Sequence, residues 1–159
     1  MRKKSSYKPR PVILDTMAYV KEGMTPVRKH ADTLINLSLK NHAAMTALTK
    51  GVATVQDMDV LFHMINATEA LYRLGFGRDF GSLVEDGLSA LKAVGRRGAE
   101  TGKFILKAHE MAAINEVMEF HDEEQLNVIT VKDMERANEV VLKEFANRRV
   151  TIISRKGKS

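Results

Sequence analysis

Apolar residues recur at three- and four-residue intervals along most of this chain, which is the spacing of one helical face. From these stripes we expect five helices, over about residues 26–50, 54–74, 80–94, 108–126 and 130–148. Each stripe is longer than a typical strand and is bounded by residues that begin or end helices. The hydrophobic pattern therefore predicts an all-α protein.

Three of the predicted helices begin with an N-terminal signal. Thr25 is expected to cap the first helix, with Pro26 in its first position. The segments 54–58 and 130–134 share the pattern Thr-Val-x-Asp-Met, in which the threonine can accept from a backbone N–H in the first turn. The repeat indicates either a duplicated helical hairpin or a good helix start used twice. We favour the second interpretation, since little outside the five residues matches.

Glycine and β-branched residues mark the expected breaks. Gly51 and Gly75 are placed to end the first and second helices, and the glycine-rich stretch 95–102 is expected to end the third. Residues 12–20 fit a short helix or an extended edge segment equally well. The run 150–153 is β-branched and could pair as a very short strand with 12–14 or 104–106, and runs this short do not decide the question.

We therefore expect a compact bundle of about five helices, arranged as two helical hairpins and a connecting helix, with extended basic arms at both ends. The expected organisation is a basic flexible arm over 1–11, a single helical domain over 12–148 and a basic C-terminal tail over 149–159. Pro9 and Pro11 restrict the residues before them to extended conformations, which excludes a helix from the arm.

The net charge of the chain is located in its ends. Residues 1–10 and 148–159 contain ten of the 25 basic residues and no acid, so 15 basic against 20 acidic residues leave the middle at −5. The basic isoelectric point thus describes the arms and not the body. The candidate contacts for phosphate, nucleic acid or an acidic partner in the arms are Arg2, Lys3, Lys4, Lys8, Arg10, Arg148, Arg149, Arg155 and Lys156.

A second basic region lies inside the domain, over residues 92–107. Its cations are Lys92, Arg96, Arg97, Lys103 and Lys107, against the single acid Glu100. Cations on a glycine-rich segment can approach phosphate or an acidic protein surface closely. The alternative is an ordinary solvated loop, and the sequence leaves both open.

No catalytic, metal-binding or cofactor-binding pattern emerges. Residues 98–104 resemble a phosphate loop but have one residue too few between the glycines and Phe104 where a magnesium-binding hydroxyl should follow. The chain has no cysteine, and its five histidines lack the partners at helical spacing that zinc or di-iron sites require. We expect no enzyme activity, no cofactor and no metal.

A helix-turn-helix reader of DNA is also disfavoured. Asp57 falls where that motif needs an aliphatic residue between its helices, and the would-be recognition helix is net negative and would be repelled by phosphates.

The nine methionines have two interpretations, a deformable core or an adaptable binding surface. We favour the core, because most of them lie on the helical stripes.

The opening segment Tyr-Lys-Pro-Arg-Pro-Val-Ile-Leu-Asp-Thr-Met-Ala-Tyr-Val at 7–20, followed by Gly23-Met24 and Pro26-Val27, resembles the start of small helical proteins encoded by phages and prophages of proteobacteria. That resemblance implies a small phage product in the cytoplasm of a bacterial host, with an accessory or host-directed binding role. The resulting hypothesis is a non-enzymatic protein that contacts a protein partner or a second copy of itself. The alternative is sequence-nonspecific nucleic-acid binding through the arms and residues 92–107. No membrane association is expected.

Overall fold

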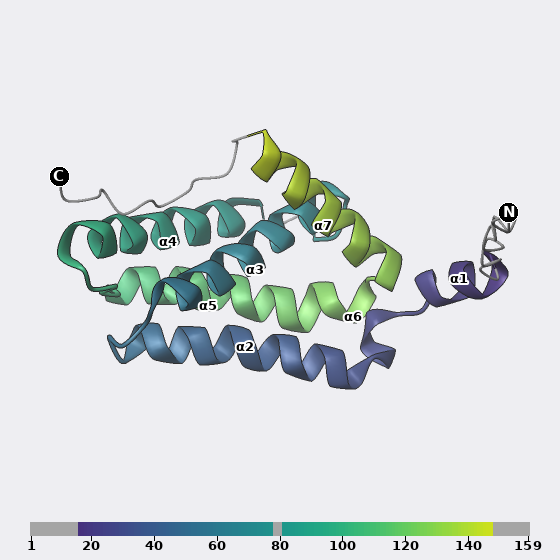
Figure 1. Cartoon of the computed structure of the whole chain (residues 1–159), viewed down its shortest axis with the longest axis horizontal. Coiled ribbons are helices and arrows are strands. Elements are labelled where there is room, and N and C mark those ends of the chain that lie inside the picture. Colours follow the sequence, from purple (N-terminus) through teal and green to yellow (C-terminus); the bar gives the residue numbers. More distant parts are fainter. Residues whose placement is uncertain (1–15, 78–80, 148–159) are drawn as a thin grey trace, which may run out of the picture.

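The computed structural model describes residues 16–77 and 81–147. Its helices are α1 (Thr16–Gly23), α2 (Ala31–Thr49), α3 (Val55–Arg73), α4 (Gly81–Thr101), α5 (Ala108–Glu119), α6 (Leu126–Val128) and α7 (Val131–Ala146), with a 3-10 turn at Val27–Lys29 and a π-helical segment at Phe120–Gln125. The predicted all-α bundle is confirmed. Its two hairpins are α2–α3 and α4–α5, and α7 packs on α3 (Figure 1).

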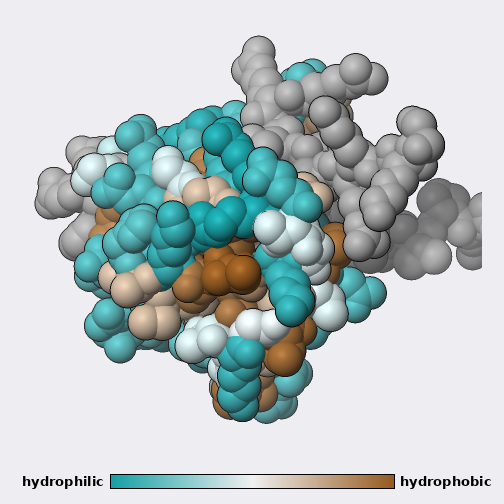
Figure 2. All heavy atoms as spheres, turned by 90° about the vertical axis from the view of Figure 1, so that its left-hand side faces the viewer, coloured by the Kyte–Doolittle hydropathy of each residue, from teal (hydrophilic) through white to brown (hydrophobic). Residues whose placement is uncertain are grey.

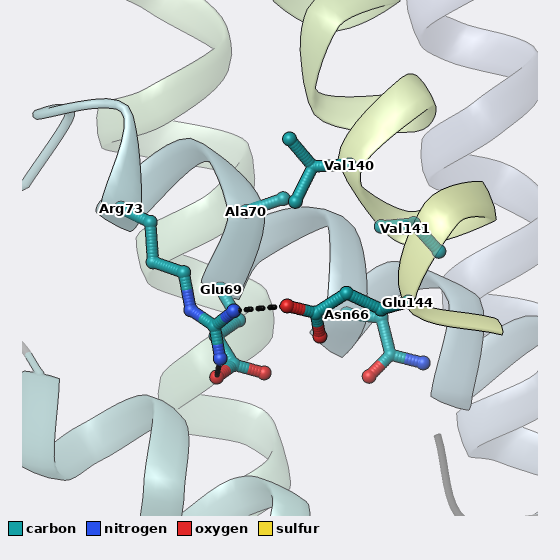
Figure 3. A pocket seen from close by; sticks show the side chains of 7 residues that line it. All are labelled: Asn66, Glu69, Ala70, Arg73, Val140, Val141 and Glu144. Atoms are coloured by element: carbon teal, nitrogen blue, oxygen red, sulfur yellow. Dashed lines mark hydrogen bonds and ion pairs between the residues drawn. The ribbon is translucent and has the colours of Figure 1, made fainter. Parts of the chain in front are cut away.

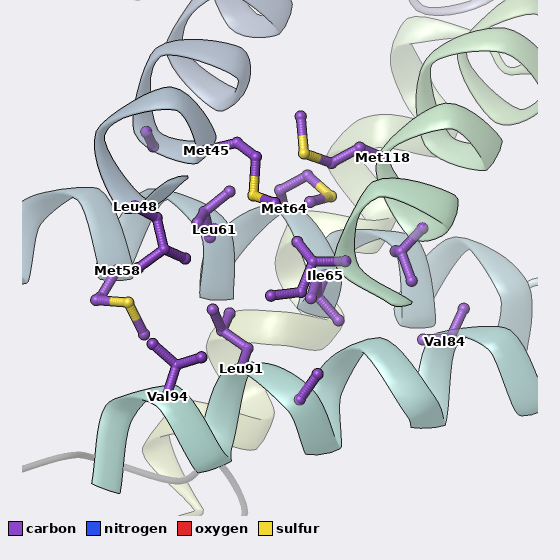
Figure 4. Close-up of a cluster of buried hydrophobic side chains, with 14 residues drawn as sticks. Met45, Leu48, Met58, Leu61, Met64, Ile65, Val84, Leu91, Val94 and Met118 are labelled. Atoms are coloured by element: carbon purple, nitrogen blue, oxygen red, sulfur yellow. The ribbon is translucent and has the colours of Figure 1, made fainter. Parts of the chain in front are cut away.

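The helix α3 is the centre of the bundle, since it packs against α2, α4, α5 and α7. The apolar spacing predicts an inward face of Met58, Leu61, Ile65, Thr68, Leu71 and Tyr72. The first five are buried, whereas Tyr72 is half-buried. Figure 4 shows how Met58, Leu61 and Ile65 meet side chains from α2, α4 and α5. Burying each large aliphatic side chain stabilises the fold by about 1.5–3 kcal/mol, so this single helix organises most of the core.

The methionines divide between core and surface. Met45, Met58, Met64 and Met118 are buried, and all four belong to the main core cluster (Figure 4). Their unbranched, polarisable side chains suit the irregular space between helices that cross at different angles. The prediction that methionine mainly builds the core is confirmed for these four residues. Two others, Met17 and Met24, are exposed on or just after α1.

The prediction that Thr25 caps a helix beginning at Pro26 is wrong. Pro26 has an extended backbone, with φ −57° and ψ 134°. The N–H of Val27 donates to the carbonyl of Ile129, and the N–H of Val131 donates to the carbonyl of Thr25, each at 3.0 Å. These long-range hydrogen bonds hold the segment out of the helical conformation, so α2 begins only after His30.

The prediction that residues 95–102 break the third helix is also wrong. The helix α4 continues through Gly95 and Gly98 to Thr101, and Gly102 then takes a positive φ of 77°. A Cβ on Gly98 would come within 2.2 Å of the ring of Phe104. The missing side chain therefore lets the following connection fold back onto the helix, and the cost of glycine in a helix is offset by this close packing.

The predicted fourth helix over 108–126 is divided into α5, the π-helical segment and α6. The apolar spacing predicts that Met111, Ile114, Val117, Met118 and His121 face inward; Met111 is half-buried and the other four are buried. On α7 the spacing predicts that Met134, Ala137, Val141 and Phe145 face inward. Ala137 is buried and Met134 and Val141 are half-buried, but the prediction for Phe145 is wrong, since it is 55% exposed. In Figure 1 the last turn of α7, in yellow, projects beyond the neighbouring helices.

The segment 12–20, which fitted a helix or an extended segment, is helical from Thr16 onward. Among the described residues the only β-type pairing is the isolated bridge between Pro26 and Thr130. Residues 104–106 form an irregular connection, while 12–14 and 150–153 lie outside the described ranges. Within those ranges no helix is both long and apolar enough to cross a lipid bilayer.

Candidate functional site

A partly open, mostly apolar cavity lies between the two connections at one end of the bundle. It has a volume of about 210 Å³ and lies between the start of α3 and the end of α4, lined by Ala53, Thr54, Val55, Gly98, Ala99, Gly102 and Phe104. Figure 2 views this end of the molecule and shows hydrophobic side chains gathered in its middle, with hydrophilic ones around them. We call the surface formed by residues 50–55 and 98–107 the open end.

Large apolar side chains in the same two connections face solvent. Val52 is 67% exposed, Val55 61% and Ile105 51%. Burial of such groups is the main favourable contribution to folding, and their exposure here contributes nothing to the stability of the isolated chain. Grouped apolar residues inside a polar rim are typical of surfaces that bind another molecule.

The wall of the cavity is fixed by Arg97. Its guanidinium donates to both carboxylate oxygens of Glu110, at 2.9 Å for Nη1 to Oε1, and also to the carbonyl of Ile105, at 2.7 Å from Nη2. Glu110 accepts in addition from the backbone N–H of Lys107 at 2.9 Å. These hydrogen bonds hold the 102–107 connection against α4, where the ring of Phe104 packs over Gly98.

Burial by itself raises the pKa of the Glu110 carboxyl, but the hydrogen bonds from Arg97 and from the Lys107 backbone lower it below its ordinary value overall. Glu110 is 3% exposed, so its charge is stabilised by these contacts and not by water. Arg97 was a candidate contact for phosphate or an acidic partner. The structure instead uses its guanidinium inside the protein.

The other candidate cations of the 92–107 region remain near the open end. Arg96, Lys103 and Lys107 are exposed, Lys92 is half-buried, and Lys50 at the end of α2 joins them from the other connection. Within the described residues none of these five takes part in an ion pair. The candidates in the arms, Arg2, Lys3, Lys4, Lys8, Arg10, Arg148, Arg149, Arg155 and Lys156, lie outside the described residues.

A buried polar network joins the π-helical segment to α3. The Thr68 hydroxyl lies 3.0 Å from His121 Nδ1, which is also 3.1 Å from Gln125 Oε1, and the Gln125 amide donates to the carbonyls of Thr68 and Phe76. His121 is 1% exposed, and this burial lowers its pKa despite the hydrogen bond that its Nδ1–H donates to Gln125 Oε1. π-Helical segments are frequent at functional sites. Here the side chains satisfy one another and hold the segment in place.

Two contacts not anticipated from the sequence join α2 to the π-helical segment. Asp122 Oδ2 accepts from the Ser38 hydroxyl at 3.1 Å and lies 3.0 Å from His42 Nε2. These are the residue types of a nucleophilic triad, but serine and histidine here both contact the carboxylate. Activation of a serine requires the histidine to accept its proton, so this arrangement ties two elements together without forming a nucleophile.

The contact between α3 and α7 carries a third polar cluster (Figure 3). Arg73 pairs with Glu69 one turn earlier on α3 and with Glu144 on α7. The cavity beside it, lined by Asn66, Ala70, Val140 and Val141 among others, measures about 10 Å³, which is room for one water molecule at most. This cluster joins two helices and leaves no space for a ligand.

Among the described residues no group of three or more histidine, aspartate or glutamate side chains is placed to hold a metal ion. Comparison of the chain with protein-family models, with curated proteins and with solved structures finds no match in any of the three.

Proposed function

We propose that this protein acts by binding another protein through the open end, without catalysing a reaction. The observation that carries the proposal is the combination of an apolar cavity with exposed Val52, Val55 and Ile105 at the same end of the bundle. The N-terminal resemblance to small phage-encoded proteins, for which accessory binding roles are common, favours the same kind of function.

The dimensions of the open end suit a protein contact better than a small-molecule site. Binding sites for drug-sized ligands typically enclose about 300–1,000 Å³ and converge several polar groups on the ligand. The cavity here is smaller and its lining is mostly apolar. Protein interfaces, in contrast, are built around a few apolar anchors surrounded by a polar rim.

The experiment compares co-purification of partners by the natural chain and by two double variants. Val52→Asn with Val55→Asn removes apolar surface from the open end and leaves the net charge unchanged. Val128→Asn with Leu142→Asn is the matched control, since these side chains are 66% and 67% exposed on other elements. Loss of bound protein with the first pair alone supports the proposal. Equal retention by both pairs would overturn it.

A second candidate function, nucleic-acid binding, is favoured by one observation. Lys50, Arg96, Lys103 and Lys107 are exposed near one another, at the two connections that form the open end. Contacts to phosphate release counterions, so such binding would weaken steeply with salt and discriminate little between sequences. A gel shift with single-stranded and duplex DNA at several salt concentrations distinguishes it from the protein-binding function.

A further inference from the structure

The cavity at the open end has the size of a single side chain. An apolar cavity of about 150 Å³ is large enough to hold benzene, so the 210 Å³ found here accommodates one aromatic or branched aliphatic group. A side chain presented by a peptide segment can fill this volume while its backbone remains outside. The geometry thus selects an anchor residue.

Several polar groups in the wall have partners within the protein. The Thr54 hydroxyl donates to Asp57 Oδ2 at 2.8 Å, and its backbone N–H donates to the same oxygen at 2.7 Å. The N–H of Gly102 donates to the carbonyl of Gly98 at 2.9 Å. A polar side chain entering the cavity would exchange its hydrogen bonds with water for a wall whose donors are already used, which costs free energy. The anchor is therefore apolar.

The rim of the open end carries a surplus of positive charge. Lys50, Arg96, Lys103 and Lys107 form no ion pair among the described residues. On the acidic side, Glu110 pairs with Arg97, and Asp57 keeps its charge while it caps α3, so three carboxylates, Asp57, Asp59 and Glu100, oppose these four cations and leave a surplus of one. Complementary charge on a partner improves both its specificity and its rate of association.

The chain's own ends fit this surface poorly. Residues 1–10 and 148–159 contain ten basic residues and no acid, so the rim cations repel them. Resting on the binding function proposed above, we infer that the open end takes an acidic segment of another protein, which inserts one aromatic or branched aliphatic side chain into the cavity between α3 and α4. Carboxylates on either side of that anchor pair with Lys50 and Lys103.

Three short peptides test this specificity on the full chain. The first is Asp-Asp-Glu-Leu-Phe-Glu-Asp-Asp, the second replaces its acids with lysine and arginine, and the third replaces Leu-Phe with Ser-Gly. Binding is followed by NMR as shifts of the backbone and methyl signals of Val55, Ala99 and Gly102. The first peptide should shift these signals in a saturable manner, and the other two should leave them largely unchanged. A thirty-nucleotide oligothymidine serves as the nucleic-acid probe.

Two variants then separate charge from shape. Lys50→Glu with Lys103→Glu should weaken binding of the acidic peptide by about two- to thirtyfold, because two exposed ion pairs are lost. Lys40→Glu with Lys143→Glu is the matched control, since both lysines are exposed on α2 and α7 away from the cavity. Ala99→Trp should occupy the cavity and abolish binding, and its folding can be checked by circular dichroism.

Tighter binding of the basic peptide, equal binding of the Ser-Gly peptide, or no binding of any peptide would each overturn the inference. Oligothymidine binding that shifts the same signals more strongly than the acidic peptide would overturn it as well and favour nucleic acid. These outcomes are separate from the co-purification experiment. If Val52→Asn with Val55→Asn loses the partner but the acidic peptide does not bind the natural chain, the proposed function stands. The inference of an acidic segment is then rejected.

Discussion

The same helix start occurs twice in this protein and has two different surroundings. At Thr54, the hydroxyl and the Asp57 carboxylate form a capping box, with Asp57 N–H donating to the hydroxyl at 3.4 Å; at Thr130 the equivalent bond from Asp133 measures 3.3 Å. Locally the two caps are nearly identical. The sequence similarity between 54–58 and 130–134 therefore reflects a shared local structure.

What differs is the chain that lies beside each cap. Next to Thr130, residues 25–27 pair with 129–131 by two backbone hydrogen bonds, and Ile129 is fully buried. We call this region the bridged joint. Next to Thr54, Val52 and Val55 are exposed and a cavity lies between α3 and α4. One helix start is thus paired with another segment of the chain, although Val128 just before it is 66% exposed, while the other start has a cavity beside it.

The largest effect that separates the two regions should come from their apolar residues. Ile129→Ala removes a fully buried side chain from the bridged joint and should lower the free energy of unfolding by about 2–5 kcal/mol. Val52→Ala, at a residue that is 67% exposed, should change it by less than about 0.5 kcal/mol. Urea denaturation of both variants measures the difference. Comparable losses would show that the open end is packed as tightly as the joint.

A smaller difference is expected from the caps themselves. Thr54→Ala and Thr130→Ala each remove a cap worth about 1 kcal/mol of the free energy of unfolding. We expect the loss to be greater at Thr130, because its bonds are partly shielded from water whereas those of Thr54 are exposed. Thermal unfolding shows which variant loses more stability. A greater loss for Thr54→Ala than for Thr130→Ala would contradict the expected difference between the caps.

A further expected effect concerns pH and the π-helical segment that leads into the bridged joint. Burial lowers the pKa of His121, whose surroundings are Thr68, Gln125, the carboxylate of Asp122 and, farther away, His63. The unfolded chain takes up this proton from about pH 6.5 downward while the folded chain resists it, so the free energy of unfolding should fall as the pH drops from 7 to 5.

The variant His121→Asn keeps a polar side chain at this position and removes the titrating group. Its free energy of unfolding should depend less on pH between 7 and 5 than that of the natural chain, while the other four histidines remain in both proteins. Urea denaturation at several pH values provides the comparison. An unchanged slope would mean that His121 does not contribute to the acid sensitivity of the fold.

The features that the sequence predicted well are local. Both capping boxes, the buried stripe of α3 and the positive φ of Gly51 and Gly75 follow from residues within one or two turns of each other. The start of α2 was mispredicted because Pro26 pairs with a segment far along the chain. Likewise the glycines of α4 suggested a break, whereas Gly98 provides space for Phe104.

The open end was only partly predictable. The surplus of cations over 92–107 was evident, but the cavity depends on bringing this region beside residues 53–55, which no local pattern specifies. A signal did exist in the apolar residues Val52, Val55 and Ile105, which stand at connections where polar side chains are usual. These residues form one surface only because the fold places the two connections side by side.

The most direct test of the central claim is site-specific crosslinking in cells that naturally contain the protein. A photoreactive phenylalanine analogue is placed at Val55 in one variant and at Leu142, which is similarly exposed on α7, in another. We predict that the variant at Val55 forms a discrete crosslink to another protein and that the variant at Leu142 does not. Crosslinking only at Leu142, or at neither position, would contradict the claim that the open end is the binding surface.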